Sequence, residues 1–373
     1  MNAFPPDSPP VFCPLTPVAY PPTEELISAT AEWLGGVSPG RTPEETYLHA
    51  VIGAGMTTRF LPEAPPHGLL SMSKYAAWSF QLDDEIDSGR MGGAAEVASV
   101  VLALARIVEV PQAALLGDLP TAVAFAEFAA DLRSWATPIQ MAHFATGFSL
   151  WMRGFVWEVA LRERGIRPTL NEYLAVRVQC AGSANAIDMG MMCLGLELPE
   201  HQWTDPAVIA LRESAMAVAV LDNDRYSRAK EDQGGEESLD VFSVILQENP
   251  HYTFPQAATE GIALRDRIMA LYLKLSEQLR RTNDPGLHTY VHAADLLITG
   301  NLDFGATSLR YTNPDSPAAA TARTDKPSDP NPAPVDVPTF AWWWDTLQRP
   351  RQAPQPAGQP PTPRSRPWPA DRP

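Results

Sequence analysis

The sequence predicts an all-α protein, built as one helical domain between two proline-rich ends. Apolar residues recur with a period close to 3.6 from Thr23 to about Tyr311, which is the spacing of amphipathic helices. No segment alternates apolar and polar residues as a strand does, and no Asn-Gly pair marks a hairpin. With 45% hydrophobic residues, the chain of 373 residues has enough apolar material for one large core.

The expected helices follow one another through this region. In chain order they cover residues 24–34, 43–52, 69–87, 94–110, 122–132, 138–164, 169–193, 206–231, 240–248, 254–283 and 286–311. Two of the starts are well marked. Thr42 stands before Pro43 and three residues before Glu45, and Thr169 stands three residues before Glu172. A threonine in this place accepts a bond from a free helix amide, and the glutamate returns one, so both are predicted helix starts.

The two ends of the chain differ from the helical domain, which we place at residues 23–312. Residues 1–22 are proline-rich and predict an extended arm. Residues 313–373 are rich in Pro, Ala, Asp and Arg and predict a disordered tail. One aromatic island, residues 339–347, interrupts this tail with three consecutive tryptophans. We interpret the island as a short turn packed loosely on the domain, and a docking segment is the alternative.

The charge and the cysteines exclude several classes of protein. A formal net charge of −16 excludes nucleic acid as a partner, and a polyanionic ligand would need cations to bridge the charges. Cys13, Cys180 and Cys193 show neither metal-type nor disulfide spacing, which predicts a reducing cytoplasm. The first ten residues do not resemble a secretory signal, and no apolar run reaches membrane-spanning length, so no stable membrane insertion is expected.

A cluster of acids ends the expected helix at residues 69–87. Its sequence is Asp83-Asp84-Glu85-Ile86-Asp87. Acids are unfavourable at a helix C-terminus, which carries partial negative charge, unless a cation offsets them. Asp83 and Asp87 are four residues apart and leave the same face of a helix, which suits a Mg²⁺ site that keeps room for water and phosphate oxygens. A solvated acidic helix end is the alternative.

A second polar stripe ends the expected helix at residues 206–231. Asn223, Ser227 and Glu231 are spaced four residues apart and so share one face. Amide, hydroxyl and carboxylate oxygens are all hard ligands that suit Mg²⁺. Lys230 lies beside the stripe and could meet a phosphate oxygen. A polar helix end, stopped by Gly234 and the glycine after it, is the alternative.

Taken together, the two motifs resemble those of the bacterial class I terpene synthases, or terpene cyclases. In that family an aspartate-rich motif precedes an Asn-x-x-x-Ser-x-x-x-Glu motif, in the order and at the separation found here. Arg177 matches the family's diphosphate-sensing arginine, and Arg310-Tyr311 matches an Arg-Tyr pair at the end of the last helix. The resemblance covers residues 23–311 and implies a helical bundle with an apolar interior.

The resemblance also implies the chemistry. A linear prenyl diphosphate would lose its diphosphate with the help of three Mg²⁺ ions, and the carbocation left behind would cyclise to a hydrocarbon or alcohol. The implied metal ligands are Asp83, Asp84, Asp87, Asn223, Ser227 and Glu231. The implied diphosphate-binding residues are Arg177, Lys230, Arg310 and Tyr311. The residues expected to line the substrate pocket are Trp78, Phe80, Ala181, Gly182 and Phe304.

This sequence departs from the family pattern at two places. The last helix often carries Trp six residues before the Arg of Arg-Tyr, and here Phe304 stands there. After the sensor arginine the family has an acidic or polar linker and then a small residue at a helix break. Here those positions are Cys180 and Ala181, followed by Gly182. Cys180 is a poor hydrogen-bond linker, whereas Ala181 or Gly182 can still supply the break.

Farnesyl diphosphate is the first choice of substrate, and geranylgeranyl diphosphate is the second. A chain-elongating prenyltransferase is disfavoured because its second motif is aspartate-rich, whereas this one is Asn/Ser/Glu. A non-catalytic helical binding protein is the other alternative. A homodimer is left open.

Overall fold

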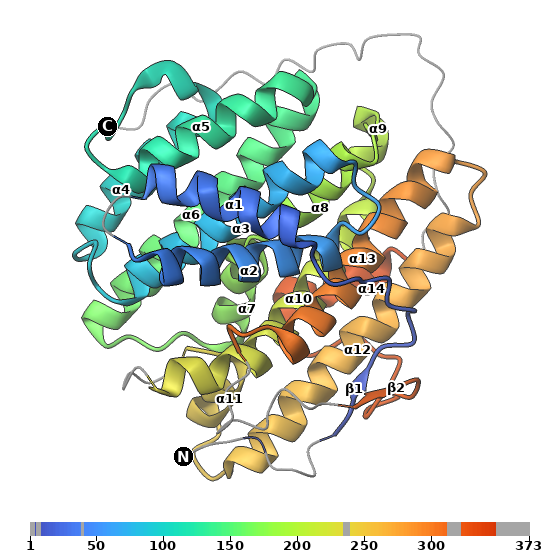
Figure 1. Ribbon diagram of the computed structural model, residues 1–373. Coiled ribbons are helices and arrows are strands. Elements are labelled where there is room, and N and C mark those ends of the chain that lie inside the picture. The colour runs from blue at the N-terminus through green and yellow to red at the C-terminus, as the bar shows by residue number, and fades with distance from the viewer. Residues whose placement is uncertain (1–3, 5–8, 39–40, 234–238, 312–321, 348–373) are drawn as a thin grey trace, which may run out of the picture.

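The structure is a computed structural model that describes residues 4, 9–38, 41–233, 239–311 and 322–347, with residues 229 and 231–233 described by their backbone alone. This part of the chain forms a bundle of helices and one two-stranded sheet (Figure 1). Its elements are β1 (Val11–Phe12), α1 (Glu24–Val37), α2 (Pro43–Phe60), α3 (Pro66–Asp87), α4 (Ala94–Glu109), the 3₁₀ helix η1 (Pro111–Ala113), α5 (Pro120–Trp135), α6 (Pro138–Arg164), α7 (Leu170–Cys180), α8 (Ser183–Cys193), α9 (Glu200–Trp203), α10 (Pro206–Gln233), α11 (Val241–Glu248), α12 (Phe254–Arg280), α13 (Pro285–Thr307), β2 (Arg323–Thr324) and α14 (Pro338–Asp345).

The all-α prediction is confirmed, and so are the two marked helix starts. The Thr42 side chain accepts from the Glu45 amide, and the Glu45 carboxylate accepts from the Thr42 amide. Thr169 and Glu172 make the same reciprocal pair before α7. Each pair satisfies two backbone groups that the first helical turn leaves without intrahelical partners, which fixes where the helix begins.

Two expected helices differ from the structure near the residues of interest. The segment 169–193 is two helices, because Ala181 and Gly182 separate α7 from α8. Gly182 has φ +71°, which is a left-handed conformation that favours glycine. The last helix of the predicted domain ends at Thr307, so Arg310 and Tyr311 lie in the segment after α13 rather than in its final turn.

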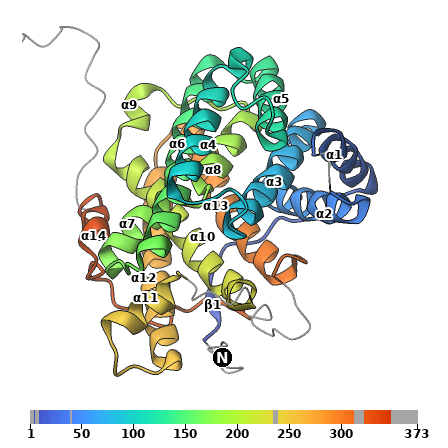
Figure 2. The ribbon, with the colours of Figure 1, turned by 90° about the vertical axis from the view of Figure 1, so that its left-hand side faces the viewer.

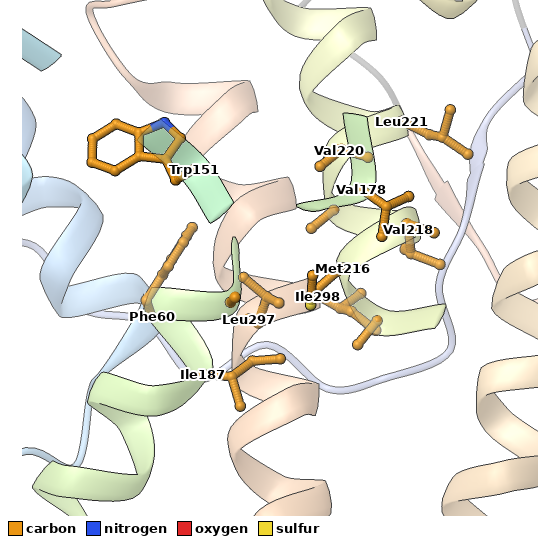
Figure 3. Close-up of a cluster of buried hydrophobic side chains, with 14 of the residues drawn as sticks. Phe60, Trp151, Val178, Ile187, Met216, Val218, Val220, Leu221, Leu297 and Ile298 are labelled. Carbon is orange, nitrogen blue, oxygen red and sulfur yellow. The ribbon is translucent and has the colours of Figure 1, made fainter. Parts of the chain in front are cut away.

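Helix α10 runs through the middle of the bundle, in contact with α7, α8, α12 and α13. Apolar side chains from several helices converge beside it (Figure 3). They include Phe60 of α2, Trp151 of α6, Val178 of α7, Ile187 of α8, Met216 of α10 and Leu297 of α13. A second, aromatic part of the core lies where α3, α5 and α6 meet, and Trp78 is stacked there on Phe125 at 4.5 Å. The interior of the bundle is therefore apolar and rich in aromatic rings.

The prediction of a disordered tail is wrong for residues 322–347. This segment contains β2 and α14, and α14 lies against α7 and α10 on the side of the bundle away from α1 (Figure 2). Trp343 is fully buried and donates its indole N–H to Glu213 Oε2 at 2.8 Å, and Phe340 is stacked on it at 4.0 Å. Trp344 is 7% exposed. The aromatic island is thus a docking segment for the helical domain itself, while residues 312–321 and 348–373 lie outside the described part.

The extended arm is tied to the same segment. Val11 and Phe12 form β1, which pairs in parallel with β2.

All three cysteines fall within the described residues, and none of them forms a disulfide. Among the helices of that part of the chain, none combines the length and the apolarity that crossing a bilayer requires.

Replacing Trp343 with alanine is expected to lower the free energy of unfolding by about 3 kcal/mol, because a buried aromatic ring and its hydrogen bond are lost. Trp342 is the matched control, since it is the neighbouring tryptophan and is 37% exposed. Urea unfolding followed by circular dichroism measures both variants. Equal losses for Trp343→Ala and Trp342→Ala would show that α14 does not depend on the buried ring.

Candidate active site

The acidic motif at the end of α3 faces two cationic side chains from other parts of the chain. Arg310 donates to Asp83 Oδ2 at 2.6 Å and to Asp84 Oδ1 at 3.0 Å. Lys230 of α10 donates to Asp84 Oδ1 at 3.0 Å and lies 3.9 Å from Asp83 Oδ2. The C-terminal ends of α3 and α10 and the segment after α13 therefore meet at one place, which we call the mouth.

Among the carboxylates of the mouth, Asp84 has a pKa that is shifted by its surroundings. Burial acts to raise the pKa of Asp84, but the hydrogen bond with His49 and the charges of Arg310 and Lys230 outweigh it and hold this pKa well below its usual range. Burial and Arg310 act to lower the pKa of Lys230, but Asp83 and Asp84 outweigh them and raise it. The pKa shifts of Asp84 and Lys230 thus both favour the charged form, because each side chain lies beside opposite charge.

The other two acids of the motif have different partners. Glu85 accepts from Arg41 at 3.0 Å and from Thr121 Oγ1 at 2.9 Å, so it faces α5 and the start of α2. Asp87 lies one turn beyond Asp83, and its Oδ1 is 3.8 Å from Arg162 of α6. The structure brings Asp83 and Asp84 into the mouth together, and it gives Asp87 a separate cationic neighbour.

The second motif reaches the same mouth from α10. Asn223 Oδ1 accepts from Arg177 at 3.0 Å, and Asn223 Nδ2 donates to the Tyr311 hydroxyl at 3.0 Å. Ser227 stands one turn further along, where it is 6% exposed, and its hydroxyl has no hydrogen-bond partner among the described residues. Glu231 belongs to α10, but its side chain lies outside what the structure describes. Arg177, Asn223 and Tyr311 are thus one connected group beside Ser227.

Asp224 holds Arg177 in this position, a role that the sequence did not assign. Arg177 Nε and Nη2 donate to Asp224 Oδ1 at 3.0 and 2.9 Å, and Arg177 Nη1 lies 3.7 Å from Glu158 Oε1. Asp224 also accepts from the Tyr173 hydroxyl at 2.7 Å and from the Val241 amide at 3.0 Å. The sequence did offer one signal. Asp224 is an acid next to Asn223, and adjacent helix residues leave different faces, so Asp224 points away from the polar stripe.

His49 is a second residue that the sequence did not single out. Its Nε2 lies 3.4 Å from Asp84 Oδ2, while its Nδ1 is 2.8 Å from the Glu45 carbonyl one turn earlier in α2. A lone histidine in an amphipathic helix carries no spacing signal that points to a partner in another helix. Only the packing of α2 on α3 brings His49 to the mouth.

Two of the predicted aromatic residues meet at the mouth. Phe80 and Phe304 are stacked with ring centroids 5.7 Å apart, and the Tyr311 ring lies edge-on to Phe304 at 5.8 Å. The guanidinium of Arg310 stands over the Phe80 ring at 4.5 Å. Phe80 and Phe304 thus connect the charged groups of the mouth to the apolar interior.

Trp78 is placed differently from Phe80. It is 1% exposed, it donates its indole N–H to the Thr121 carbonyl at 2.8 Å, and it is stacked on Phe125. These are the contacts of a core residue between α3 and α5. The structure therefore does not bring Trp78 together with the other predicted pocket residues.

The helix break after Arg177 is confirmed at Ala181 and Gly182. A side chain on Gly182 would first meet the Trp151 ring at 3.7 Å, an ordinary contact, so the positive φ is what favours glycine there. Cys180, in the linker position, packs closely on Gly154 of α6. A Cβ added to Gly154 would lie only 2.0 Å from the Cβ of Cys180. The small residues at 154 and 180 let α7 approach α6 and carry Arg177 to Asn223.

The residues of the mouth fit a divalent cation that prefers oxygen ligands. Asp83 and Asp84 supply carboxylates from α3, and Asn223 and Ser227 supply amide and hydroxyl oxygens from α10. The buried Ser227 hydroxyl supports this fit, because a buried polar group without a partner is costly unless something binds it. Within the described residues no three His, Cys, Asp or Glu side chains form a closed metal cage.

A family model matches about half of the chain. It is described as terpene synthase family 2, C-terminal metal binding, and it covers residues 74–266. The match contains the acidic motif of α3, Arg177 and the polar stripe of α10.

Curated relatives match nearly the whole chain. Spiroviolene synthase of Streptomyces violens is 33% identical over 91% of this chain and 97% of its own length. Diterpene cyclase DtcycB of a Streptomyces species is 30% identical over 89% of this chain and 96% of its own length. A (+)-T-muurolol synthase of Streptomyces clavuligerus, described as (2E,6E)-farnesyl diphosphate cyclizing, is 29% identical over 89% of this chain and 81% of its own length.

A solved structure shares the fold. The crystal structure of the SVS_A2 protein from ancestral sequence reconstruction superposes with a TM-score of 0.77 at 30% identity, over 90% of this chain and 98% of that chain.

Replacing Ser227 with alanine is expected to separate stability from metal binding. Without metal, the free energy of unfolding should stay equal or rise, because a buried hydroxyl without a partner is removed. Ser214 is the control, since it is a buried serine of the same helix whose hydroxyl already donates to the Leu211 carbonyl at 3.0 Å.

Thermal unfolding in a chelator, and again with Mg²⁺ and inorganic pyrophosphate, measures both effects. Ser214→Ala should lose about 1 kcal/mol and keep the stabilisation by ligands. Ser227→Ala should lose that stabilisation. Equal ligand-induced shifts in the two variants would rule out Ser227 as a ligand.

Proposed function

This chain belongs to the bacterial class I terpene synthases, and we propose that it ionises geranylgeranyl diphosphate and cyclises the carbocation to a diterpene. Terpene cyclases of this family act on linear prenyl diphosphates and release diphosphate. The observation that carries the proposal is the mouth, where carboxylates of α3 and polar oxygens of α10 stand beside three cationic side chains. These are Arg177, Lys230 and Arg310.

The choice of a C20 substrate comes from the relatives. The relative named as a diterpene cyclase is 30% identical to this chain over 96% of its own length. Farnesyl diphosphate, the first choice from the sequence alone, is the second candidate because that relative uses it. Chain elongation is disfavoured further, because Asn223 and Ser227 occupy the second motif where an elongating enzyme carries aspartates.

We propose Mg²⁺ as the metal and three as the number of ions, as the family resemblance implies. Asp83, Asp84 and Asp87 would hold ions on the α3 side of the mouth. Asn223, Ser227 and Glu231 would hold an ion on the α10 side. Bound Mg²⁺ supplies Lewis-acid stabilisation of the negative charge that develops on the departing diphosphate.

The cationic side chains bind the diphosphate by exchanging partners. Arg310 and Lys230, now paired with Asp83 and Asp84, can turn the same donors to phosphate oxygens once those carboxylates bind metal. Arg177 and Tyr311 flank Asn223 and add donors on the α10 side. Their stabilisation grows as charge moves to the leaving group, which lowers the barrier to ionisation.

The interior must then protect the carbocation rather than react with it. The side chains labelled in Figure 3 are apolar, and none of them carries a hydroxyl, an aliphatic amine or a carboxylate. The faces of Phe80 and Phe304 stand between the charged mouth and this interior, where an aromatic face stabilises a cation by about 0.5–2 kcal/mol. The carbonyl of Gly182 or Ala181, at the α7–α8 break, is proposed to face the same space.

A cytoplasmic location is part of the proposal, since the three unpaired cysteines suit a reducing compartment.

Incubation with Mg²⁺ and geranylgeranyl diphosphate is expected to give a cyclic diterpene in a hexane extract analysed by mass spectrometry. Parallel incubations with geranyl and farnesyl diphosphate test chain length, and added isopentenyl diphosphate tests elongation. A cyclic C15 product alone would make farnesyl diphosphate the substrate. Longer linear diphosphates would replace cyclisation by elongation.

Asp83→Ala and Asn223→Ala are each expected to reduce turnover by at least about 100-fold, because each removes a group that stabilises the developing diphosphate charge. Glu85→Gln is the matched control, since this acid of the same motif faces Arg41 and Thr121 instead of the mouth. Circular dichroism should show unchanged helicity in all three. Full turnover by Asp83→Ala would contradict the assignment of the site.

A further inference from the structure

The two chain ends that the sequence placed outside the catalytic domain meet on the outer side of α12. The Val11 amide donates to the Ala322 carbonyl at 2.9 Å, and the Cys13 amide donates to the Thr324 carbonyl at 3.0 Å. Figure 1 shows the resulting pair β1–β2 beside α12. We call residues 9–13 together with residues 322–328 the clasp.

One buried arginine connects the clasp to α10. Arg265 of α12 donates through Nε and Nη2 to the two carboxylate oxygens of Asp222, both at 2.8 Å. Its third nitrogen, Nη1, donates to the Phe12 carbonyl in β1. Arg265 is 4% exposed and Asp222 is 2% exposed. Such a two-pronged pair fixes the orientation of both side chains, because a planar guanidinium matches a carboxylate in one geometry.

The C-terminal half of the clasp reaches the same place through Asp266. The Ser328 amide and hydroxyl donate to Asp266 Oδ2 at 2.9 and 2.8 Å, and Asp266 is fully buried. Arg265 Nη1 also lies 3.4 Å from Asp266 Oδ1. A continuous chain of polar contacts therefore runs from Ser328 through Asp266 and Arg265 to Asp222.

The N-terminal half touches α10 a second time. Both terminal nitrogens of Arg225 donate to the Pro9 carbonyl at 3.2 Å, and the Arg225 guanidinium stands over the Phe4 ring at 5.2 Å. Asp222 and Arg225 are three residues apart in α10, and Asn223 lies between them. The clasp thus holds the turn of α10 that carries the first residue of the polar stripe.

We propose that Arg265 is a positioning residue for the metal site. By holding Asp222 it fixes the rotation of the last turns of α10, so that Asn223 and Ser227 face the mouth, and the clasp in turn holds Arg265. The inference rests on the proposed function, because it needs Asn223 and Ser227 to bind metal with diphosphate.

A purely stabilising role is the competing explanation, and it makes a different prediction. Two opposite charges buried together add little net stability compared with apolar residues of similar size, whereas one charge left alone is strongly destabilising. Replacing both members of the pair by apolar residues should therefore restore stability. It should not restore the orientation that two parallel hydrogen bonds impose.

The test compares variants of the full chain by calorimetric titration of inorganic pyrophosphate in the presence of Mg²⁺. Arg265→Lys keeps the positive charge but loses the two parallel N–H donors that hold Asp222. It is expected to weaken pyrophosphate binding by at least about tenfold. Arg267→Lys is the matched control. Arg267 lies two residues away and donates to the Ala333 and Pro334 carbonyls at 2.8 Å, so its side chain faces the C-terminal segment instead of Asp222.

The double variant Asp222→Leu/Arg265→Met separates the two explanations. If Arg265 positions α10, thermal stability recovers relative to Arg265→Met alone while pyrophosphate binding stays weak. Hydrogen exchange of the α10 amides then remains faster than in the wild type. Recovery of stability and binding together would overturn the positioning role, and so would unchanged binding by Arg265→Lys.

The wild type distinguishes this inference from the proposed function. If the unaltered protein converts a prenyl diphosphate but the variants bind pyrophosphate as it does, only the positioning role fails. If the unaltered protein neither binds pyrophosphate with Mg²⁺ nor converts any prenyl diphosphate, the proposed function fails and the inference with it.

Discussion

The burial of charge around the last turns of α10 is the constraint on which the rest of the structure depends. Asp222, Asp224 and Arg228 are each 5% exposed or less, and a buried charge is tolerated only when it is paired. Their partners come from three directions: Arg265 of α12, Arg177 of α7, and Asp240 just before α11. Because all three pairs must form together, α10 can be rotated in only one way. That rotation presents Asn223 and Ser227 to the acids of α3.

The mouth balances charge in a different manner. Asp83 and Asp84 are paired with Arg310 and Lys230 at the edge of the bundle. The four side chains are between 5% and 36% exposed. Arg310 and Lys230 can turn from these carboxylates to a bound anion, whereas the Asp222–Arg265 and Arg228–Asp240 pairs are buried on both sides and hold α10 in place. The protein therefore combines a rigid support with an exchangeable set of donors and acceptors, which suits the binding of metal ions with a polyanion and its later release as diphosphate.

Much of the site could be predicted because it is encoded in local spacing. The capping pairs at Thr42 and Thr169 and the stripe of Asn223 and Ser227 follow from helix geometry within a few residues, whereas the break at Gly182 was expected only from the resemblance to the family. The clasp could not be predicted this way. Two-residue strands have no periodicity, and the proline-rich composition around Trp343 outweighed the tryptophans. Partners such as Asp222 and Arg265 are 43 residues apart, so only the packing of α10 on α12 reveals them. Trp78 is the opposite case. Its position shortly before the acidic motif suggested that it lines the substrate pocket, whereas its contacts place it in the core.

The measurement that tests the central claim most directly is diffraction from crystals soaked with Mn²⁺ and inorganic pyrophosphate, because manganese substitutes for magnesium and is identified by its anomalous signal. The account predicts anomalous peaks within coordination distance of Asp83 on one side of the mouth and of Asn223 and Ser227 on the other, with pyrophosphate between them and in contact with Arg310. Peaks at other acidic residues, with the Ser227 hydroxyl still unbound, would contradict it.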